Sequence, residues 1–359
     1  MRQENEDNIL LIFGAGASFD IANGVEGVPI TKKLFTAHNR LFSRALGTEY
    51  GQHAQSVIDE VIEKFQSDSK TFDLEGILNS FLDRSERSVN AKQSLLGLRF
   101  FMKDLVKSYE NRSKERTPNS NSYVRILRKL QQWQETTDLP INLVTFNYDT
   151  LLDSACERIF HINLTSARSS GWDSLDTYIE NSRIKLYRPH GCIKWVRQAD
   201  YIGDQLFAEE TVRNMDLSLY SINFSRNELE DGQNEIPALA LPFKDNKQFE
   251  WPDKHRDEFM HSLKGVTKVF LIGWRAAEPH FIKLIKDSIN PKARWIIINR
   301  SAESGNVVIA NLEKLQIKNT FRYDKGFSKF VNSQEFKDEL VELERAVQEK
   351  QDPRTIEGL

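Results

Sequence analysis

The sequence predicts an α/β fold in which a Rossmann-like parallel sheet carries a large helical insertion. Four short apolar runs have the length and composition of buried strands, and they cover residues 8–13, 141–144, 267–272 and 294–298. Gly14, Gly273 and Asn299 directly follow three of these runs, and helical patterns begin soon after the second and third. Strands that alternate with helices in this way are typical of a parallel sheet. In such sheets, ligands bind beyond the carboxyl ends of the strands.

The composition is that of a folded globular protein. Of the 359 residues, 39% are apolar and 28% are charged, so neither a disordered nor a fibrous class fits. The net charge is -3, and without a basic excess direct nucleic-acid binding is not indicated. Residues 1–7 are polar and acidic, unlike a signal peptide, and no run approaches the roughly 18 apolar residues of a membrane span. We therefore expect a cytoplasmic protein that does not contact a membrane.

The sequence contains no recognisable metal site. Its cysteines, Cys156 and Cys192, are far apart and neither belongs to a CxxC pair, so a cysteine zinc ribbon is excluded. Carboxylates and histidines are not clustered at the spacing of metal ligands, which also argues against a nuclease. We therefore expect that the protein binds no metal.

The turn after the first apolar run is rich in small residues, with Gly-Ala-Gly-Ala-Ser at residues 14–18. Small residues let backbone N–H groups approach a phosphate at the start of a helix, whose dipole favours anions. Phe19, however, stands where the dinucleotide fingerprint G-x-G-x-x-G has its third glycine. A phosphate-binding turn and a plain tight turn both fit. The loop at residues 20–31 is either a lid over a ligand or a surface connection.

Residues 32–133 have a different pattern, because apolar residues recur there at the spacing of helices. We expect this stretch to be a helical insertion. The predicted domains are a core formed by residues 1–31 and 134–310, the insertion at 32–133 and a C-terminal helical extension at 311–359.

The second apolar run leads into Thr-Phe-Asn-Tyr-Asp at residues 145–149. In a backbone that is still extended, Asn147 and Asp149 share one face, whereas Tyr148 faces the other way. We therefore expect a carboxamide and a carboxylate to converge on one pocket at the carboxyl end of this strand.

A histidine stands at a corner further along the chain. His190 lies between Pro189 and Gly191, after an extended segment that begins at Ile184. Proline and glycine fix the backbone and leave room, so the ring is presented to its surroundings. A lone histidine is more often structural, but one held in this way is a candidate for acid–base chemistry.

Four segments, taken in order, resemble the NAD site of the sirtuin fold, in the form seen in bacterial sirtuin-like defence proteins. They are the turn at residues 14–18, the Thr-Phe-Asn-Tyr-Asp segment, the Pro-His-Gly corner and the pair Ile298-Asn299. The resemblance covers about residues 8–305, with the helical stretch as an insertion. The pairing of the second and third segments is its most specific feature.

The resemblance implies roles for nine residues. Gly14, Ala15, Gly16 and Ser18 would line the NAD phosphates, Asn147 would act at the nicotinamide ribose, Asp149 would hold the carboxamide, His190 would be the catalytic histidine, Gly273 matches a glycine after the late strand, and Asn299 would contact the adenosine ribose. The match is loose at Arg275 and Glu278, so it implies nothing for them.

Protein deacylases of this family also carry a four-cysteine zinc ribbon, which this chain lacks. The resemblance therefore implies an NAD hydrolase, with NAD as the substrate and nicotinamide and ADP-ribose as the products. Either His190 or Asp149 can serve as the base. Two alternatives stay open: a sensor that binds NAD or ADP-ribose without hydrolysis, and an ADP-ribosyltransferase.

Family analogy points to a context for such an activity. An unrestrained NAD hydrolase would empty its own cell, so we expect a gate in the contacts of a homo-oligomer or in a partner, such as a HerA-type ATPase or another sensor subunit. The analogous role is antiphage defence by abortive infection.

Overall fold

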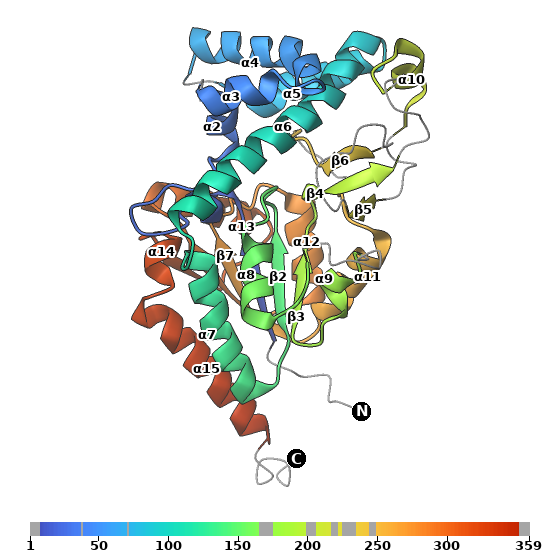
Figure 1. Ribbon diagram of the computed structural model, residues 1–359. Helices are drawn as coiled ribbons and strands as arrows, with labels where there is room; N and C mark the ends of the chain where they lie inside the picture. Colours follow the sequence, from blue (N-terminus) through green and yellow to red (C-terminus); the bar gives the residue numbers. More distant parts are fainter. Residues whose placement is uncertain are drawn as a thin grey trace.

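A six-stranded parallel sheet forms the centre of the protein (Figure 1). The computed structural model describes residues 8–36, 39–69, 72–164, 175–198, 206–216, 222–224, 235–243 and 249–351. In spatial order the strands are β3 (Ile184–Tyr187), β2 (Ile141–Thr145), β1 (Asn8–Phe13), β7 (Val266–Ile272), β8 (Arg294–Ile298) and β9 (Thr320–Tyr323). Every neighbouring pair is parallel. The predicted α/β class with a Rossmann-like sheet is therefore confirmed.

The strand order changes direction at β1. From β1 the chain adds β2 and β3 on one side of the sheet, and later β7, β8 and β9 on the other. Connections that leave neighbouring strands in opposite directions open a crevice at the carboxyl ends of those strands. The switch point of this sheet therefore lies beyond the ends of β1 and β7.

β1 is buried along its whole length. In the middle of this strand, Leu11 is aligned with Leu143 of β2 on one side and with Phe270 of β7 on the other. A strand that is covered on both faces needs apolar side chains at successive positions. This burial explains why the central strands appear in the sequence as continuous apolar runs.

Helices cover the sheet. α7 (Ser122–Thr137) packs against α8 (Leu151–Phe160) and α15 (Gln334–Gln351), as Figure 1 shows. The other helices of this part of the fold are α1 (Ala15–Phe19), α9 (Thr177–Glu180), α11 (Asp253–Ser262), α12 (Pro279–Ser288), α13 (Ala302–Lys314) and α14 (Phe327–Phe330). Within the described ranges, no helix has the length and apolar character needed to cross a membrane.

The chain between β1 and α7 forms a group of helices, drawn in blue to teal at the top of Figure 1. They are α2 (Thr31–Thr36), α3 (Arg40–Leu46), the 3-10 helix η1 (Gly51–Ala54), α4 (Gln55–Ser67), α5 (Leu74–Ser85) and α6 (Val89–Arg116). α6 has 28 residues and is therefore about 42 Å long. It packs against α3, η1 and α5, and also against β4 and β6 of a second sheet. The domain boundaries at residues 32 and 134 stay a prediction.

This second sheet was not expected from the sequence. It is antiparallel, and its strands in spatial order are β5 (Ile222–Phe224), β4 (Gly191–Gln198) and β6 (Glu235–Leu239). β5 has three residues, too few for a periodic pattern to be visible in the sequence. The short helix α10 (Glu209–Asn214) lies in the connection between β4 and β5.

The C-terminal part is also more than a helical extension. β9 pairs with β8 and forms one edge of the main sheet, so the sheet continues beyond residue 310. Two helices, α14 and α15, follow it, and the side chain of Ser333 between them accepts a hydrogen bond from Phe336 N at 3.2 Å. Residues 1–7 and 352–359, which belong to the predicted core and extension, lie outside the described residues.

Candidate functional site

A cavity of about 910 Å³ lies at the carboxyl edge of the main sheet. Its volume is in the upper part of the usual range for ligand pockets. All nine residues that the sequence singled out line it: Gly14, Ala15, Gly16, Ser18, Asn147, Asp149, His190, Gly273 and Asn299. The structure therefore brings together segments that are far apart in the chain, as expected for strand ends at a switch point. The role of each residue stays a prediction.

The glycines of the first turn are explained by close packing. A Cβ atom on Gly14 would lie 2.6 Å from Trp274 Cα, and one on Gly16 would lie 2.9 Å from Gly273 Cα. Gly273 itself has a φ of +60°, and a Cβ there would lie 2.4 Å from Ala17 N. The turn after β1 and the turn after β7 thus touch backbone to backbone. Packing alone requires these glycines, so their presence does not decide between the two predictions for this turn.

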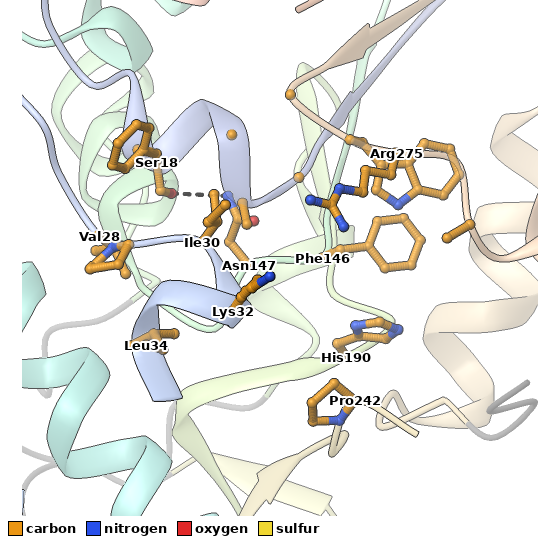
Figure 2. A pocket seen from close by; sticks show the side chains of 18 of the residues that line it. Ser18, Val28, Ile30, Lys32, Leu34, Phe146, Asn147, His190, Pro242 and Arg275 are labelled. Atoms are coloured by element: carbon orange, nitrogen blue, oxygen red, sulfur yellow. Dashed lines mark hydrogen bonds between the residues drawn. The ribbon is translucent and has the colours of Figure 1, made fainter. Parts of the chain in front are cut away.

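Asn147 is held by a small network of buried hydroxyls. Its Nδ2 atom donates to Ser18 Oγ at 2.9 Å, a bond drawn in Figure 2, and to Tyr123 Oη at 3.1 Å. Ser18 and Tyr123 are 2.8 Å apart, oxygen to oxygen. Within the described chain, the buried Oδ1 atom of Asn147 has no hydrogen-bond partner. A buried acceptor of this kind is suited to a donor on a ligand.

Asp149 is a carboxylate in an environment that disfavours its charge. Its side chain is buried, and Oδ1 accepts a hydrogen bond from Leu151 N at 3.2 Å. Burial, and to a lesser extent the negative charge of Glu110, raise the pKa of Asp149 to about 6. A hydrogen bond from Ser18 and the charge of Arg188 oppose this rise. Asp149 therefore gains and loses its proton close to neutral pH.

Arg188 connects the segment at residues 145–149 with the Pro-His-Gly corner, although no pattern in the sequence indicated this role. It is fully buried and forms an ion pair with the equally buried Asp153, in which the Nε to Oδ1 distance is 3.0 Å. Its remaining N–H groups donate to the backbone O atoms of Asn147 and Asp149, each at 2.9 Å. Because Arg188 directly precedes the Pro-His-Gly corner, one guanidinium fixes the Asn147 loop relative to His190.

The corner at His190 depends on the glycine that follows it. Gly191 has a φ of +66°, and a Cβ there would lie 1.9 Å from Ala238 O, so only glycine fits. The backbone O of His190 accepts from Ala240 N at 3.0 Å, and that of Pro189 accepts from Glu250 N at 2.6 Å. Two residues that follow β6 in the chain, Ala240 and Glu250, therefore hold the backbone of the corner in place.

The His190 ring is half-buried and reaches the cavity, as Figure 2 shows. It meets Phe146 edge to face, with ring centroids 4.8 Å apart. Burial lowers the pKa of His190 to about 4, the charge of Glu250 opposes this shift, and His280 adds to it. The ring is therefore neutral at pH 7 and can accept a proton.

The expectation that Tyr148 faces away from Asn147 and Asp149 was wrong. β2 ends at Thr145, and the chain bends from Tyr148 onward, so the two-residue period of a strand no longer applies. Tyr148 lines the same cavity, and its hydroxyl donates to Ala240 O at 2.5 Å.

The helical group and the loop after α1 also line the cavity. The lining includes Val28 and Ile30 from the loop at residues 20–31, Leu34 from α2, residues 72–75 at the start of α5 and Val106 from α6. The loop therefore forms a wall of the cavity instead of a plain surface connection. The sequence analysis had a place over a ligand as one of two interpretations of this loop, but it did not indicate that α2, α5 and α6 reach the cavity, because these contacts join segments far apart in the chain.

α6 contacts both polar segments of the site. Glu110 is buried and accepts from Thr150 N at 2.5 Å and from Thr150 Oγ1 at 2.8 Å. Arg99, about three turns earlier on the same helix, forms an ion pair with Glu250 at 3.0 Å. Glu250 is the residue whose N–H holds the corner at Pro189. Through Glu110, near its C-terminal end, the helix thus contacts the loop that contains Asn147 and Thr150. Through Arg99 and Glu250 it also reaches the corner at His190.

Arg275 and Glu278, to which the resemblance gave no role, line the cavity as well. Burial raises the pKa of Glu278 to about 7. In the described part of the chain, no group of three or more His, Cys, Asp or Glu side chains is arranged to hold a metal ion. Cys156 and Cys192 are buried and free.

Comparisons with known proteins gave likenesses at the level of structure only. Neither a scan against protein-family models nor a search of curated proteins found a match. Similar solved structures include a complex of a Sir2 homologue with NAD, with 13% identity, a TM-score of 0.37 and coverage of 97% of this chain and 91% of that one. Another is a mutant Sir2 homologue with 2′-O-acetyl ADP-ribose, with 13% identity, a TM-score of 0.39 and coverage of 97% and 95%.

A third similar structure is Sir2 with an inhibitor, 2′-O-acetyl-ADP-ribose and a deacetylated peptide, with 10% identity, a TM-score of 0.40 and coverage of 93% and 94%. Identities of 10–13% and TM-scores of 0.37–0.40 do not establish a shared family or activity. The fold class of the protein rests on its own sheet topology.

Proposed function

We propose that the protein is an NAD hydrolase that releases nicotinamide and leaves ADP-ribose. The observation that carries this proposal is the convergence of Asn147, Asp149 and His190 on one cavity at the switch point of the sheet. The same residues carry the sequence resemblance to the NAD site of sirtuin-like proteins.

The bond to be broken joins the ribose C1′ atom to the pyridinium nitrogen of nicotinamide. Its electron pair leaves with that nitrogen, whose positive charge is thereby neutralised, and the sugar passes through an oxocarbenium-like state. A water oxygen then bonds to C1′ and gives up one proton. The products are nicotinamide, ADP-ribose and that proton, so atoms and charge balance.

Asn147 suits the task of orienting the water or a ribose hydroxyl. Its amide is fixed through Nδ2, whereas the buried Oδ1 atom is open to a donor. An orienting group that is already fixed loses little freedom when the substrate binds. Asn147 therefore acts as an acceptor that needs no rearrangement.

Two groups can take the proton. His190 is neutral at pH 7 because its pKa is lowered to about 4, and Asp149 is mostly ionised there because its pKa is about 6. A carboxylate can also bind the N–H groups of the nicotinamide carboxamide. Its higher pKa makes Asp149 the stronger base of the two, and His190 is the one that the resemblance favours.

The setting of this activity is part of the same proposal. By the resemblance, the protein depletes NAD in the bacterial cytoplasm as an effector of antiphage defence. Its activity is then gated by oligomer contacts or by a partner such as a HerA-type ATPase. Because helices of the predicted insertion line the cavity, their movement on assembly is a direct route to the site.

The test is release of nicotinamide and ADP-ribose from NAD by the purified full chain at high concentration. We expect release by the wild type and a loss of at least about 100-fold in Asn147→Ala and His190→Ala. His261→Ala, at an exposed position on α11, is the matched control and should keep full activity. Full activity in the two site variants would refute the proposed site.

Other outcomes point to the alternatives. Binding of NAD without release favours a sensor, or an enzyme that awaits its partner. Transfer of label from NAD to a polymer identifies an ADP-ribosyltransferase. Absence of NAD binding refutes the proposal.

A further inference from the structure

The cavity is rich in acidic groups for a site that is proposed to take a dinucleotide. Among the described residues, the carboxylates that line it are Asp20, Asp73, Glu75, Asp149 and Glu278, and the cationic side chains are Lys32, Arg275 and Arg300. A dinucleotide brings a diphosphate with two negative charges, which the ionised carboxylates of this set repel. A cationic side chain close to the diphosphate would offset this repulsion.

The turn after β1 offers fewer free N–H donors to a phosphate than its small residues suggest. The N–H groups of Gly14, Gly16 and Ala17 donate to Ile272 O, Gly273 O and Gly14 O, at 3.0, 2.9 and 2.9 Å. They are thus used within the protein. α1 has only five residues, so its dipole is small. Three N–H groups of this turn are therefore already occupied, and the small dipole of α1 does little to balance the two negative charges of a diphosphate.

Two of the three cations are already engaged. Lys32 Nζ donates to Ser69 O at 3.1 Å and lies 5.3 Å from the centre of the Phe72 ring. Arg300 lies 5.4 Å from the centre of the Phe19 ring and 3.7 Å from a carboxylate oxygen of Glu26.

Arg275 is different. Among the described residues its guanidinium has no hydrogen bond or ion pair, whereas its backbone O accepts from Asn311 Nδ2 at 3.1 Å. Figure 2 shows the guanidinium extending from its loop into the pocket, on the side that faces Asn147. The side chain is exposed, so it is free to meet a ligand.

The backbone around Arg275 is fixed in an unusual conformation. Gly273, two residues earlier, accepts the N–H of Gly16, which anchors the loop to the turn after β1. Ala276, the next residue, is buried and has a φ of +52°, in the left-handed region that non-glycine residues rarely adopt. Such conformations persist where the surroundings enforce them, and they cluster at functional sites. The loop that carries Arg275 thus contains a conformation of this kind directly after it.

We propose that Arg275 binds the diphosphate of the dinucleotide. The planar guanidinium offers two parallel N–H donors to phosphate oxygens, and its charge does not depend on pH in the physiological range. Arg275 is then a binding residue that selects diphosphate-containing ligands and takes no part in proton transfer. This inference rests on the proposed function, because it presumes that the cavity takes NAD or ADP-ribose.

The test compares ligands with and without phosphates. Binding of ADP-ribose and of adenosine is measured by calorimetry on the full chain, as the wild type, Arg275→Gln, Arg275→Lys and Arg128→Gln, at low and high salt. Arg128 is exposed on α7 and does not line the cavity, so its variant is a matched control for loss of one positive charge. Because Arg275 is also exposed, its variants should keep the thermal stability of the wild type.

We expect Arg275→Gln to weaken ADP-ribose binding by about tenfold to a hundredfold, with adenosine binding unchanged. The salt dependence of ADP-ribose binding should also decrease. Arg275→Lys should recover part of the loss, because it keeps the charge but not the two-pronged geometry. Arg128→Gln should behave as the wild type.

The outcomes separate this inference from the function on which it rests. Unchanged ADP-ribose binding in Arg275→Gln, or an equal loss for both ligands, would overturn the role of Arg275 and leave the NAD site standing. A wild type that binds neither ADP-ribose nor NAD would overturn the proposed function and this inference with it.

Discussion

Replacing Asp149 with asparagine should stabilise the folded protein at neutral pH while it removes a group from the proposed site. The pKa of Asp149 is raised from 3.8 to about 6, chiefly by burial. A raised carboxyl pKa means that the folded state holds the proton more tightly than the unfolded state. The charged form therefore destabilises the fold above about pH 6, and this effect disappears below about pH 4, where both states are protonated.

The size of the effect follows from the shift. Because the pKa of Asp149 is raised by about two, its ionised form lowers the free energy of unfolding by about 3 kcal/mol at pH 7 and above. An asparagine carries no charge at any pH and can keep the hydrogen bond from Leu151 N. The stability gained by Asp149→Asn should therefore be larger at about pH 8 than at about pH 4 by up to 3 kcal/mol, with most of the change between pH 4 and pH 6.

Urea unfolding of the wild type and the variant over this pH range measures the difference directly. Asp83→Asn, at an exposed position on α5, is the matched control and should show no such slope. In a Glu110→Gln background, the pH-dependent part should shrink, because the charge of Glu110 contributes to the raised pKa of Asp149. A difference between the variant and the wild type that does not change with pH would refute the assigned pKa.

Two further predictions concern the His190 corner and the identity of the base. Gly191→Ala should destabilise the protein by about 2 kcal/mol or more, because the new Cβ would lie 1.9 Å from Ala238 O. The control is Gly24→Ala, which is also at a positive φ but in open space and should lose only about 1 kcal/mol of stability. Equal losses of the two variants in thermal unfolding would show that the contact with Ala238 is unimportant. A catalytic base must be unprotonated. If Asp149 is the base, nicotinamide release should fall as the pH decreases below about 6, and if His190 is the base, release should persist to about pH 4. If the decrease of activity at low pH occurs at the same pH in Asp149→Asn as in the wild type, Asp149 is excluded as the base.

The central strands and the position of the site could be predicted from the sequence for the same reason. Strands buried on both faces are apolar throughout, as at β1, and they stand out as continuous runs. Parallel strands also bring their carboxyl ends to one edge, so Gly14, Asn147 and Asn299 line one cavity although they are far apart in the chain. Local pattern and sheet geometry were sufficient for these features.

The edge strand β9 and the end of the extended segment after β2 could not be predicted in this way. β9 is a four-residue edge strand that is only partly buried, so it has neither an apolar run nor a clear alternation. The chain is no longer extended at Tyr148, where the sequence analysis had assumed an extended backbone, and this side chain lines the cavity. Nothing in a short window of sequence marks either event.

The polar partners of the site were hidden for a different reason. Tyr123 holds Asn147 from α7, and Arg188 holds the loop backbone while it pairs with Asp153. Each of these residues lies in a stretch that has an ordinary explanation as part of a helix or a strand. Their role depends on which elements become neighbours, and this is decided by the tertiary fold.

The contacts of α6 suggest how the proposed gate could act on the site. Arg99 and Glu110 lie on one helix, about 16 Å apart along its axis, and they contact two different segments next to the proposed site. Arg99 acts on the His190 corner through Glu250, and Glu110 acts on Thr150, next to Asp149. A rotation of α6 that displaces Arg99 and Glu110 by unequal amounts would change the distance between His190 and Asp149, so this distance would respond to a partner bound at the helical group. The same helix packs against α3, η1 and α5, which places those elements between a binding event at the helical group and the chemistry at the sheet.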